Sequence, residues 1–361
     1  MNYYRFEKAL QAVIEGSIQL SNSQKGRIKE VCEGVLLARS SQLSWIARRL
    51  PQATNKDSRI QWLSRLLETR YMSQEFVYAL FVKKILERHK PARLHVLMDR
   101  TAFSVHDTDL VSLSLNFRKR SIPIGWKFMP HGMSGYELQT NLIKRCYSLL
   151  PSDIPVVFHG DNEFGGVRLM QYLRDLGWDF IVGQSSKNYH RSYPNGKWQT
   201  FGDLRVTKTQ SIYLEDIEVT KKYAYGLVNA FAFYKPRFGK RRRKQDIIYC
   251  ATSLPIAPTL RRVGHRRWGV ECQFRDMKSS GWNIQNCDLT NPKRREGLLN
   301  VLNICYLWAT SLGRWLCKTS QRNLVDSKSI RHLSLFRLGW DWLVNQYSTG
   351  RTCPALLTLY Q

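Results

Sequence analysis

A succession of short apolar runs between residues 94 and 183 constrains the fold more than any other feature of the sequence. Five runs have the length of buried strands: Leu94–Met98, Leu110–Leu115, Ile122–Phe128, Pro155–Phe158 and Phe180–Gly183. Stretches with helical spacing separate the last three, at 136–149 and 167–176. Uninterrupted apolar runs of this length are typical of strands inside a sheet. The order predicts β-β-β-α-β-α-β, a mixed sheet covered by helices, and therefore an α/β fold.

The region before these strands, residues 1–90, has the spacing of helices. We expect four helices there, at Tyr3–Glu15, Ser21–Arg39, Ser41–Leu50 and Asp57–Arg70. A short helix stopped by Pro51 and followed by an Arg-rich helix, with Asp57 as its N-cap, suggests a helix-turn-helix-like DNA reader. Arg59 and Arg65 would then face the DNA. An ordinary helical bundle with a basic surface is the alternative.

The remaining chain divides by the same signals. Strand-like runs dominate from residue 185 to 252, at Trp198–Val206, Ile212–Thr220, Tyr223–Tyr234 and Asp246–Ala251. Helical spacing returns afterwards, at 291–319 and 333–347. We therefore expect five regions: a helical DNA-binding domain (1–90), the first part of the core (91–184), a β-rich insertion (185–252), a core helix (253–290) and C-terminal helices (291–361).

The charge of the chain points to a polyanionic partner. Lys and Arg number 56 against 28 Asp and Glu, a net charge of +28 with an isoelectric point near 10.0. Nucleic acid is the commonest ligand for such a field. Seven cations fall within residues 235–244, and Arg241, Arg242, Arg243 and Lys244 are candidates for contact with backbone phosphates. A solvated loop is the alternative for that run. A protein of the membrane surface would instead favour one basic amphipathic helix.

No segment predicts secretion or membrane insertion. The first ten residues lack an apolar signal core, and the apolar stretch from Leu298 to Leu316 is interrupted by Asn300, Asn303 and Arg314. The eight cysteines show neither a CxxC pair nor metal-finger spacing. They suggest reduced thiols in the core of a cytoplasmic protein.

Three carboxylates stand where α/β proteins place their sites. Asp99 ends the first predicted strand, Asp161 follows the fourth, and Glu271 lies on the helix after the sheet. A carboxylate directly after an apolar strand is costly to bury unpaired. Three together can hold hard divalent cations such as Mg²⁺ or Mn²⁺ through oxygen ligands, and two such ions can support phosphodiester chemistry. The carboxylates of Asp107, Asp109 and Glu163 are rival ligands.

Residues 257–282 have the pattern of one amphipathic helix. Arg267, Glu271 and Lys278, at i, i+4 and i+11, fall on one face at about 100° per residue. Apolar residues form a stripe beside them: Val263, Val270, Phe274 and Met277. A solvated helix face with i,i+4 ion pairs is the alternative reading of these charges.

Together these features resemble the DDE transposases of bacterial insertion sequences, in particular insertion-sequence family four with its Tyr-Arg-Glu-Lys signature. The order Asp99, Asp161, Glu271 carries the resemblance, with Arg267 four residues before the Glu and Lys278 seven after it. Asp-Arg-Thr after the first strand and Gly-Asp-Asn-Glu-Phe-Gly after the fourth also look familial. The signature Tyr would be residue 264, which is Gly here; His265 is a possible substitute.

The resemblance implies an RNase H-like catalytic core and metal-assisted phosphoryl transfer. Asp99, Asp161 and Glu271 would hold Mg²⁺ or Mn²⁺. Water would cut one strand at the end of the element, and the freed 3′-OH would later attack target DNA. A catalytically inactive or repurposed copy that only binds DNA is the alternative function.

The resemblance also implies contacts with DNA and with a second protein copy. Arg267 and Lys278 would grip phosphates near the cleaved end. An aromatic side chain would stack on a flipped base, with Trp198 as the candidate and Trp268 and Trp282 as alternatives. The partners would be double-stranded transposon ends and target DNA, bound by a homodimer in the bacterial cytoplasm at the nucleoid.

Overall fold

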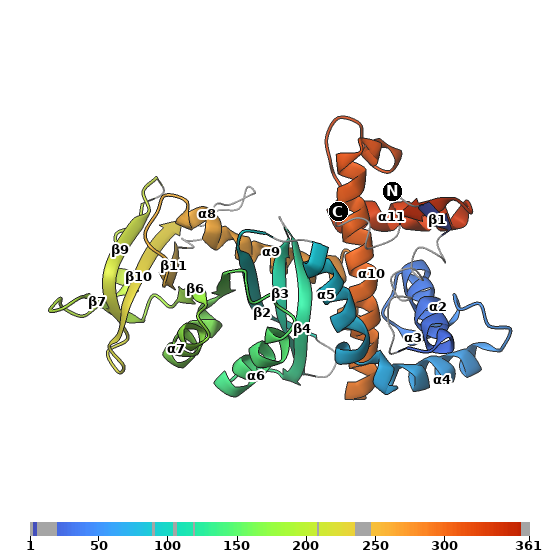
Figure 1. The fold of residues 1–361 in the computed structure, drawn as a ribbon, viewed down its shortest axis with the longest axis horizontal. Coiled ribbons are helices and arrows are strands. Elements are labelled where there is room, and N and C mark those ends of the chain that lie inside the picture. Colours follow the sequence, from blue (N-terminus) through green and yellow to red (C-terminus); the bar gives the residue numbers. More distant parts are fainter. Residues whose placement is uncertain are drawn as a thin grey trace.

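The computed structural model describes residues 3–5, 20–88, 91–103, 107–117, 120–207, 209–234 and 247–354. Its elements run from the N-terminal helices through a long sheet to two C-terminal helices (Figure 1). The prediction of an α/β chain with a mixed sheet, a β-rich insertion and flanking helices is confirmed.

Five strands form the core of the sheet, in the order β4-β3-β2-β5-β6. They are β2 (Leu94–Ala102), β3 (Thr108–Phe117), β4 (Arg120–Pro130), β5 (Val156–Gly160) and β6 (Asp179–Gln184). The first three pair antiparallel, whereas β5 is parallel to both β2 and β6. Helices α6 (Tyr136–Tyr147) and α7 (Val167–Asp175) precede and follow β5. This is the predicted β-β-β-α-β-α-β order, with the strand directions of an RNase H-like core.

The insertion continues the core sheet to ten strands. Its strands are β7 (Tyr189–Ser192), β8 (Gln199–Thr200), β9 (Ile212–Val219), β10 (Tyr225–Tyr234) and β11 (Ile247–Thr252), in the order β11-β10-β9-β7-β8 beyond β6. The predicted strand Trp198–Val206 is wrong beyond Thr200, because residues 201–203 form the 3₁₀ turn η4 (Phe201–Asp203), which Thr200 and Asp203 cap reciprocally.

Short helices make up most of the described N-terminal region: α2 (Asn22–Ala38), α3 (Leu43–Ala47), α4 (Lys56–Leu67), η1 (Arg70–Met72), η2 (Gln74–Tyr78) and α5 (Ala79–Arg88). Ser21 and Gln24 form a capping box at the start of α2. The N-cap of α4 is Asn55, whose side chain accepts from the Ser58 amide at 2.8 Å, and not Asp57. Asp57 already lies in the first turn, where its charge favours the helix dipole.

The two ends of the described chain form a small sheet of their own. Strand β1 (Tyr3–Arg5) pairs antiparallel with β12 (Thr352–Pro354). The predicted helix Tyr3–Glu15 is therefore wrong at its start, and residues 6–15 lie outside the described residues. Its partner strand is about 350 residues away in the sequence, so local spacing contains no trace of this pairing.

Helix α10 (Pro292–Lys318) is the buried helix expected from the interrupted apolar stretch. It packs against α2, α4 and α11 (Leu335–Ser348), and the turn η7 (Gln321–Leu324) follows it (Figure 1). One continuous hydrophobic cluster joins the N-terminal helices, the sheet and these C-terminal helices. None of the described helices combines the length and apolar character needed to cross a bilayer.

The segment at 257–282 is not one helix. It divides into α8 (Leu260–Gly264), the 3₁₀ turn η5 (His265–Arg267) and α9 (Trp268–Met277), with the turn η6 (Ile284–Asn286) beyond. Gly264 and Gly269 flank the break, and glycine costs a helix about 1 kcal/mol relative to alanine. The apolar stripe divides as well. Val263 packs against the cluster between α8 and the insertion, whereas Val270 lies in the main core.

Buried polar contacts fix α9 against the core strands. Arg120 Nε on β4 lies 3.0 Å from Asp276 Oδ2, and both side chains are almost wholly buried. Gln273 Oε1 accepts from the hydroxyls of Ser114 on β3 and Ser121 on β4. These contacts determine which face of α9 is turned toward the sheet.

Because removal of one partner leaves a buried charge unpaired, we expect Asp276→Ala to reduce the free energy of unfolding by about 3 kcal/mol. Glu68→Ala, which breaks the half-exposed pair with Arg294, should cost about 1 kcal/mol or less. Denaturant unfolding of both variants measures the difference. Equal losses would mean that the Arg120–Asp276 pair does not anchor α9.

Candidate active site

Three elements bring the predicted carboxylates to one side of the core. Asp99 lies within β2, opposite Ser112 of β3, and its strand continues to Ala102 instead of ending at the carboxylate. Asp161 is the first residue after β5, the parallel neighbour of β2. It also caps the 3₁₀ turn η3 (Asn162–Phe164) by accepting from the Glu163 amide at 2.9 Å. Glu271 lies in the first turn of α9.

The guanidinium of Arg267 lies between these carboxylates. Its Nη2 donates to Glu271 Oε1 at 2.6 Å, and its Nη1 lies 3.4 Å from Asp99 Oδ2. The charge of Asp161 also acts on it. Arg267 and Glu271 therefore form the i,i+4 pair of the solvated-face alternative, but the pair faces Asp99 of the sheet. The arrangement is a cation in contact with two members of the predicted triad and subject to the charge of the third.

The pKa of Asp99 reflects the charges that lie close to it. The pKa of Asp99 is raised to about 7, chiefly by burial; the charges of Asp161 and Glu271 also raise it, whereas Arg267 and the Arg100 amide lower it. Burial lowers the pKa of Arg267, but the three carboxylates together raise it above its ordinary value. The carboxylates repel one another and are held by the cation among them.

A cleft of about 420 Å³ opens beside this cluster. Asp99, Glu271 and Lys278 line it together with Arg100, Thr101, Phe274, Arg275, Ser279 and Gln285. Lys278 is the C-cap of α9, and burial lowers its pKa while the charge of Asp109 opposes that effect. The structure thus brings the predicted clamp residues Arg267 and Lys278 to the same place as Asp99 and Glu271.

The rival carboxylates have other partners. Glu163 accepts from Arg100 Nε at 2.7 Å and from the amide and hydroxyl of Ser134 at 2.7 and 2.6 Å. Asp109 is paired with Arg100, His131 and the Gly132 amide. Asp107 is exposed. Sequence reasoning missed Arg100, which joins the two buried rivals; its position directly after Asp99 in Asp-Arg-Thr was the available signal.

Glycines explain the loop that carries Asp161. A Cβ on Gly165 would lie 2.0 Å from the Gly183 carbonyl oxygen of β6, and one on Gly183 would lie 2.4 Å from Asn162 Oδ1. The loop therefore packs its backbone directly on β6, an approach that only glycine permits. This contact fixes the start of η3 and with it the position of Asp161.

Position 264, where the resemblance expects Tyr, is closed by the insertion. A Cβ on Gly264 would lie 3.3 Å from the ring of Phe231 on β10. His265, the possible substitute, packs edge-on against Phe233, with ring centroids 5.2 Å apart. An aromatic ring of the insertion thus occupies the space next to the backbone of residue 264.

The aromatic candidates for base stacking lie in different surroundings. Trp198 stacks under the guanidinium of Arg191 at 4.8 Å, next to β8 at the edge of the sheet. Seven strand spacings separate β8 from β2, about 34 Å, so the structure does not bring Trp198 to the cleft. Trp282 is fully buried and donates to the Val35 carbonyl. Trp268 on α9 is 44% exposed.

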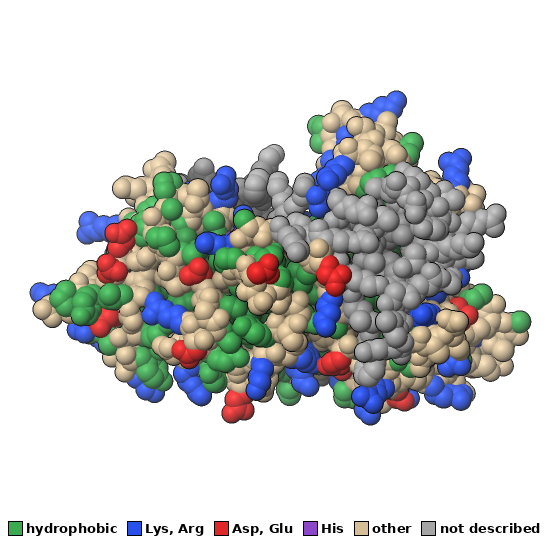
Figure 2. Space-filling model, viewed as in Figure 1, with side chains coloured by type: hydrophobic (Ala, Val, Ile, Leu, Met, Phe, Trp, Pro, Cys, Tyr) green, Lys and Arg blue, Asp and Glu red, His purple; other side chains and the backbone are tan. Residues whose placement is uncertain are grey.

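Two further DNA-contact candidates, Arg59 and Arg65, lie on α4, away from the helix α9 that carries Glu271 (Figure 1). Arg59 donates to the Leu50 carbonyl at 3.1 Å, which ties α4 to the end of the preceding turn, and Arg65 is exposed on α4. Arg241, Arg242, Arg243 and Lys244 lie outside the described residues. Lys and Arg side chains are spread over the described part of the face in Figure 2 and do not gather in one patch.

The donor chemistry of the cluster fits a divalent cation. Carboxylate oxygens are the ligands that Mg²⁺ and Mn²⁺ prefer, and the raised pKa of Asp99 reflects burial first and then the charges of Asp161 and Glu271, which a cation would offset. Among the described residues, no three acidic, imidazole or thiol groups lie close enough to hold a metal ion as they stand. The guanidinium of Arg267 lies between two of the carboxylates, and a metal ion would replace it there.

The raised pKa of Asp99 predicts a stability change with pH. Its folded pKa of about 7 exceeds the unfolded value of 3.8, so between these values the folded state keeps a proton that the unfolded state loses, and stability falls as the pH rises. In metal-free protein we expect the stabilisation by Asp99→Asn to be about 2–3 kcal/mol larger at pH 8 than at pH 5. Urea unfolding at both pH values measures it. The exposed Asp153→Asn should show no such difference, and a pH-independent effect of Asp99→Asn would contradict the prediction.

Comparison with known proteins found a matching family model and a similar solved structure. Residues 139–308 match the family model described as "Transposase DDE domain", a range that contains Asp161, Arg267, Glu271 and Lys278. A search of the curated proteins found no match. A solved structure described as "Cryo-EM structure of piggyBac transposase synaptic complex with hairpin DNA" is similar at 10% identity and a TM-score of 0.44, covering 96% of this chain and 77% of that one. Over residues 139–308 the chain is thus similar to the DDE domain of transposases, and this similarity indicates an enzyme that cleaves and transfers DNA.

Proposed function

We propose that this chain is a transposase of the insertion-sequence type, which cuts DNA at the ends of its element and joins the freed 3′-OH to target DNA. One observation carries the proposal. Asp99, Asp161 and Glu271 come from β2, the loop after β5 and α9, and they converge around a single cation beside a cleft. Membership of insertion-sequence family four, and a bacterial host, belong to the same proposal.

The proposed roles follow from charge and position. Asp99, Asp161 and Glu271 would hold two divalent ions, which when bound activate the attacking water or hydroxyl and stabilise the leaving oxygen. Arg267 leaves the carboxylates and pairs with a phosphate of the bound strand. Lys278, on the wall of the cleft, adds a second positive charge to the same phosphates. In-line displacement needs this positioning and charge neutralisation and no nucleophile from the protein.

The proposed partners are double-stranded DNA and a second copy of the chain. The net charge of +28 supports binding to DNA, and Arg65 on α4 and the cations at 241–244 are the proposed backbone contacts. Pairing of two transposon ends by a homodimer, and action at the nucleoid of a bacterial cytoplasm, rest on the resemblance.

A DNA-binding protein without cleavage activity is the second candidate. The observation that favours it is Gly264, whose backbone is covered by Phe231 where the signature Tyr would stand. Cleavage of end DNA by the unmodified protein decides between the two candidates.

We expect Asp99→Ala, Asp161→Ala and Glu271→Ala each to reduce Mg²⁺-dependent cleavage at least 1,000-fold while binding to the ends is retained, because each removes a metal ligand and not a DNA contact. The substrate is a duplex with the ends of the element that encodes the chain, and product is measured on denaturing gels. Asp107→Ala removes an exposed carboxylate and should cleave normally. Retained cleavage in any of the three variants would remove that residue from the proposed set.

Because Arg267 now neutralises the carboxylates, we expect Arg267→Gln to bind Mn²⁺ at least tenfold more tightly than the unmodified protein in the absence of DNA. Electron paramagnetic resonance of free Mn²⁺ measures the affinity directly. Arg275→Gln is the matched control, because Arg275 lines the same cleft but donates to Cys272 and not to the triad. Equal affinities in the two variants would mean that Arg267 does not occupy the cation position.

A further inference from the structure

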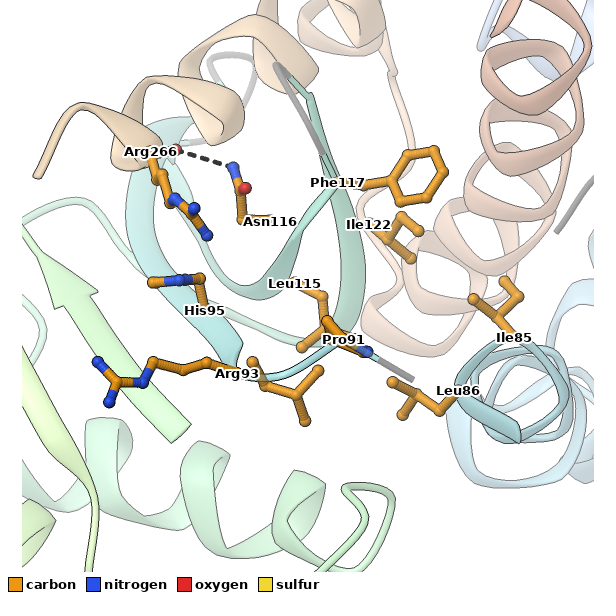
Figure 3. Close-up of a pocket in the computed structure, with 11 residues that line it drawn as sticks. Ile85, Leu86, Pro91, Arg93, His95, Leu115, Asn116, Phe117, Ile122 and Arg266 are labelled. Carbon is orange, nitrogen blue, oxygen red and sulfur yellow. Dashed lines mark hydrogen bonds between the residues drawn. The ribbon is translucent and has the colours of Figure 1, made fainter. Parts of the chain in front are cut away.

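A second pocket shares no lining residue with the cleft beside the carboxylates. It has a volume of about 280 Å³ and opens between the end of α5, the start of β2 and the β3–β4 end of the core (Figure 3). His95, on its wall, precedes Asp99 by four residues on β2, a separation of about 13 Å on the same face of the sheet. The two consecutive arginines of η5 lie at different sites. Arg267 binds the carboxylates, whereas Arg266 lines this pocket.

One side of the pocket is cationic. In Figure 3 the guanidinium of Arg266 points toward the His95 ring, and Arg93 lies on the other side of that ring. Both arginines act electrostatically on His95. Arg100, Arg120, Arg191 and Arg267 all have carboxylate partners, but neither Arg93 nor Arg266 forms an ion pair within the described part of the chain. Asn116 Nδ2 donates to the Arg266 carbonyl at 3.2 Å and so fixes the backbone that carries this charge.

The buried histidines add a hydrogen-bond donor. His95 Nδ1 and His159 Nε2 are 2.9 Å apart, and His159 Nδ1 is buried with no hydrogen-bond partner among the described residues. A buried nitrogen lone pair without a partner is more easily tolerated than a buried N–H without one. His159 therefore donates through Nε2, and His95 carries its proton on Nε2. Burial, then Arg266 and Arg93, lower the pKa of His95 to about 4, so the ring is neutral at physiological pH and offers an N–H.

The opposite side of the pocket is apolar. Figure 3 shows Ile85, Leu86, Pro91, Phe117 and Ile122 across the pocket from the two guanidinium groups. An anion at Arg266 and Arg93 would thus have an apolar surface beside it. Arginine forks match phosphate oxygens, and in a nucleotide the phosphate is joined through a sugar to a base with flat apolar faces.

We propose that this pocket binds the phosphate group of a nucleotide, with Arg266, Arg93 and the Nε2–H of His95 as donors and the apolar wall against the sugar or base. The site is separate from the carboxylate cluster and needs no metal ion. The nucleotide can belong to a DNA strand or be free, and the phosphate chemistry is the same.

The test is calorimetric titration of the full chain with dAMP, deoxyadenosine and inorganic phosphate in metal-free buffer. Because no metal or cleavage is involved, its result is independent of the proposed catalysis. We expect dAMP to bind at least tenfold more tightly than deoxyadenosine. Arg266→Gln and Arg93→Gln should each weaken dAMP at least tenfold. Arg261→Gln removes the same charge from α8, where Arg261 stacks on Phe233, and should change the affinity less than twofold.

Equal binding of dAMP and deoxyadenosine would overturn the proposal. Equal losses of dAMP affinity in Arg266→Gln and Arg261→Gln would also overturn it, because they would indicate only the general electrostatic field of the protein. The circular dichroism of each variant checks that it is folded. Displacement of dAMP by a short 5′-phosphorylated single strand at micromolar concentration supports the site and assigns it to DNA. Retention of dAMP supports the site and assigns it to a free nucleotide.

Discussion

Mutual repulsion among three carboxylates is the constraint on which the described site depends. Asp99, Asp161 and Glu271 can share one edge of the core only while a positive charge lies among them, because a buried negative charge without compensation is costly. Arg267 supplies that charge from the turn that leads into the helix of Glu271. The positive charge of Arg267 therefore holds the cluster together. Any incoming cation must take the place of that charge.

Contacts with the core strands keep α9, and with it the turn η5, in place. Helix α9 is locked to β3 and β4 by Gln273 and Asp276, so Glu271 cannot rotate away from β2. Arg100 draws Glu163 and Asp109 into a separate network directly beside Asp99. Glu163 and Asp109 thus have partners of their own. The charge of the triad is balanced by one movable side chain, that of Arg267.

The core and the i,i+4 pairing of Arg267 with Glu271 were predictable because their signals are local. Apolar runs identify β2 and β5, an alternating run identifies β3, and the i,i+4 spacing follows from helical geometry. What sequence could not supply depends on contacts between distant residues. The pairing of Tyr3–Arg5 with Thr352–Pro354 is one such case. The different surroundings of Asp161 and Glu163 are another case. Glu163 is bound by Ser134 and Arg100, which come from other elements.

The single hydrophobic cluster that runs from α2 through the sheet to α11 has a consequence for how the molecule responds to stress. Helix α10 is buried on nearly all sides, with α2 and α4 covering one part of it and α11 another. Removal of the N-terminal helices would uncover a long apolar surface, so the proposed DNA reader and the carboxylate core should melt in one cooperative transition. The proposed reader would then be unable to swing freely on a linker, and the packing of α10 would fix the orientation of its DNA relative to the cleft.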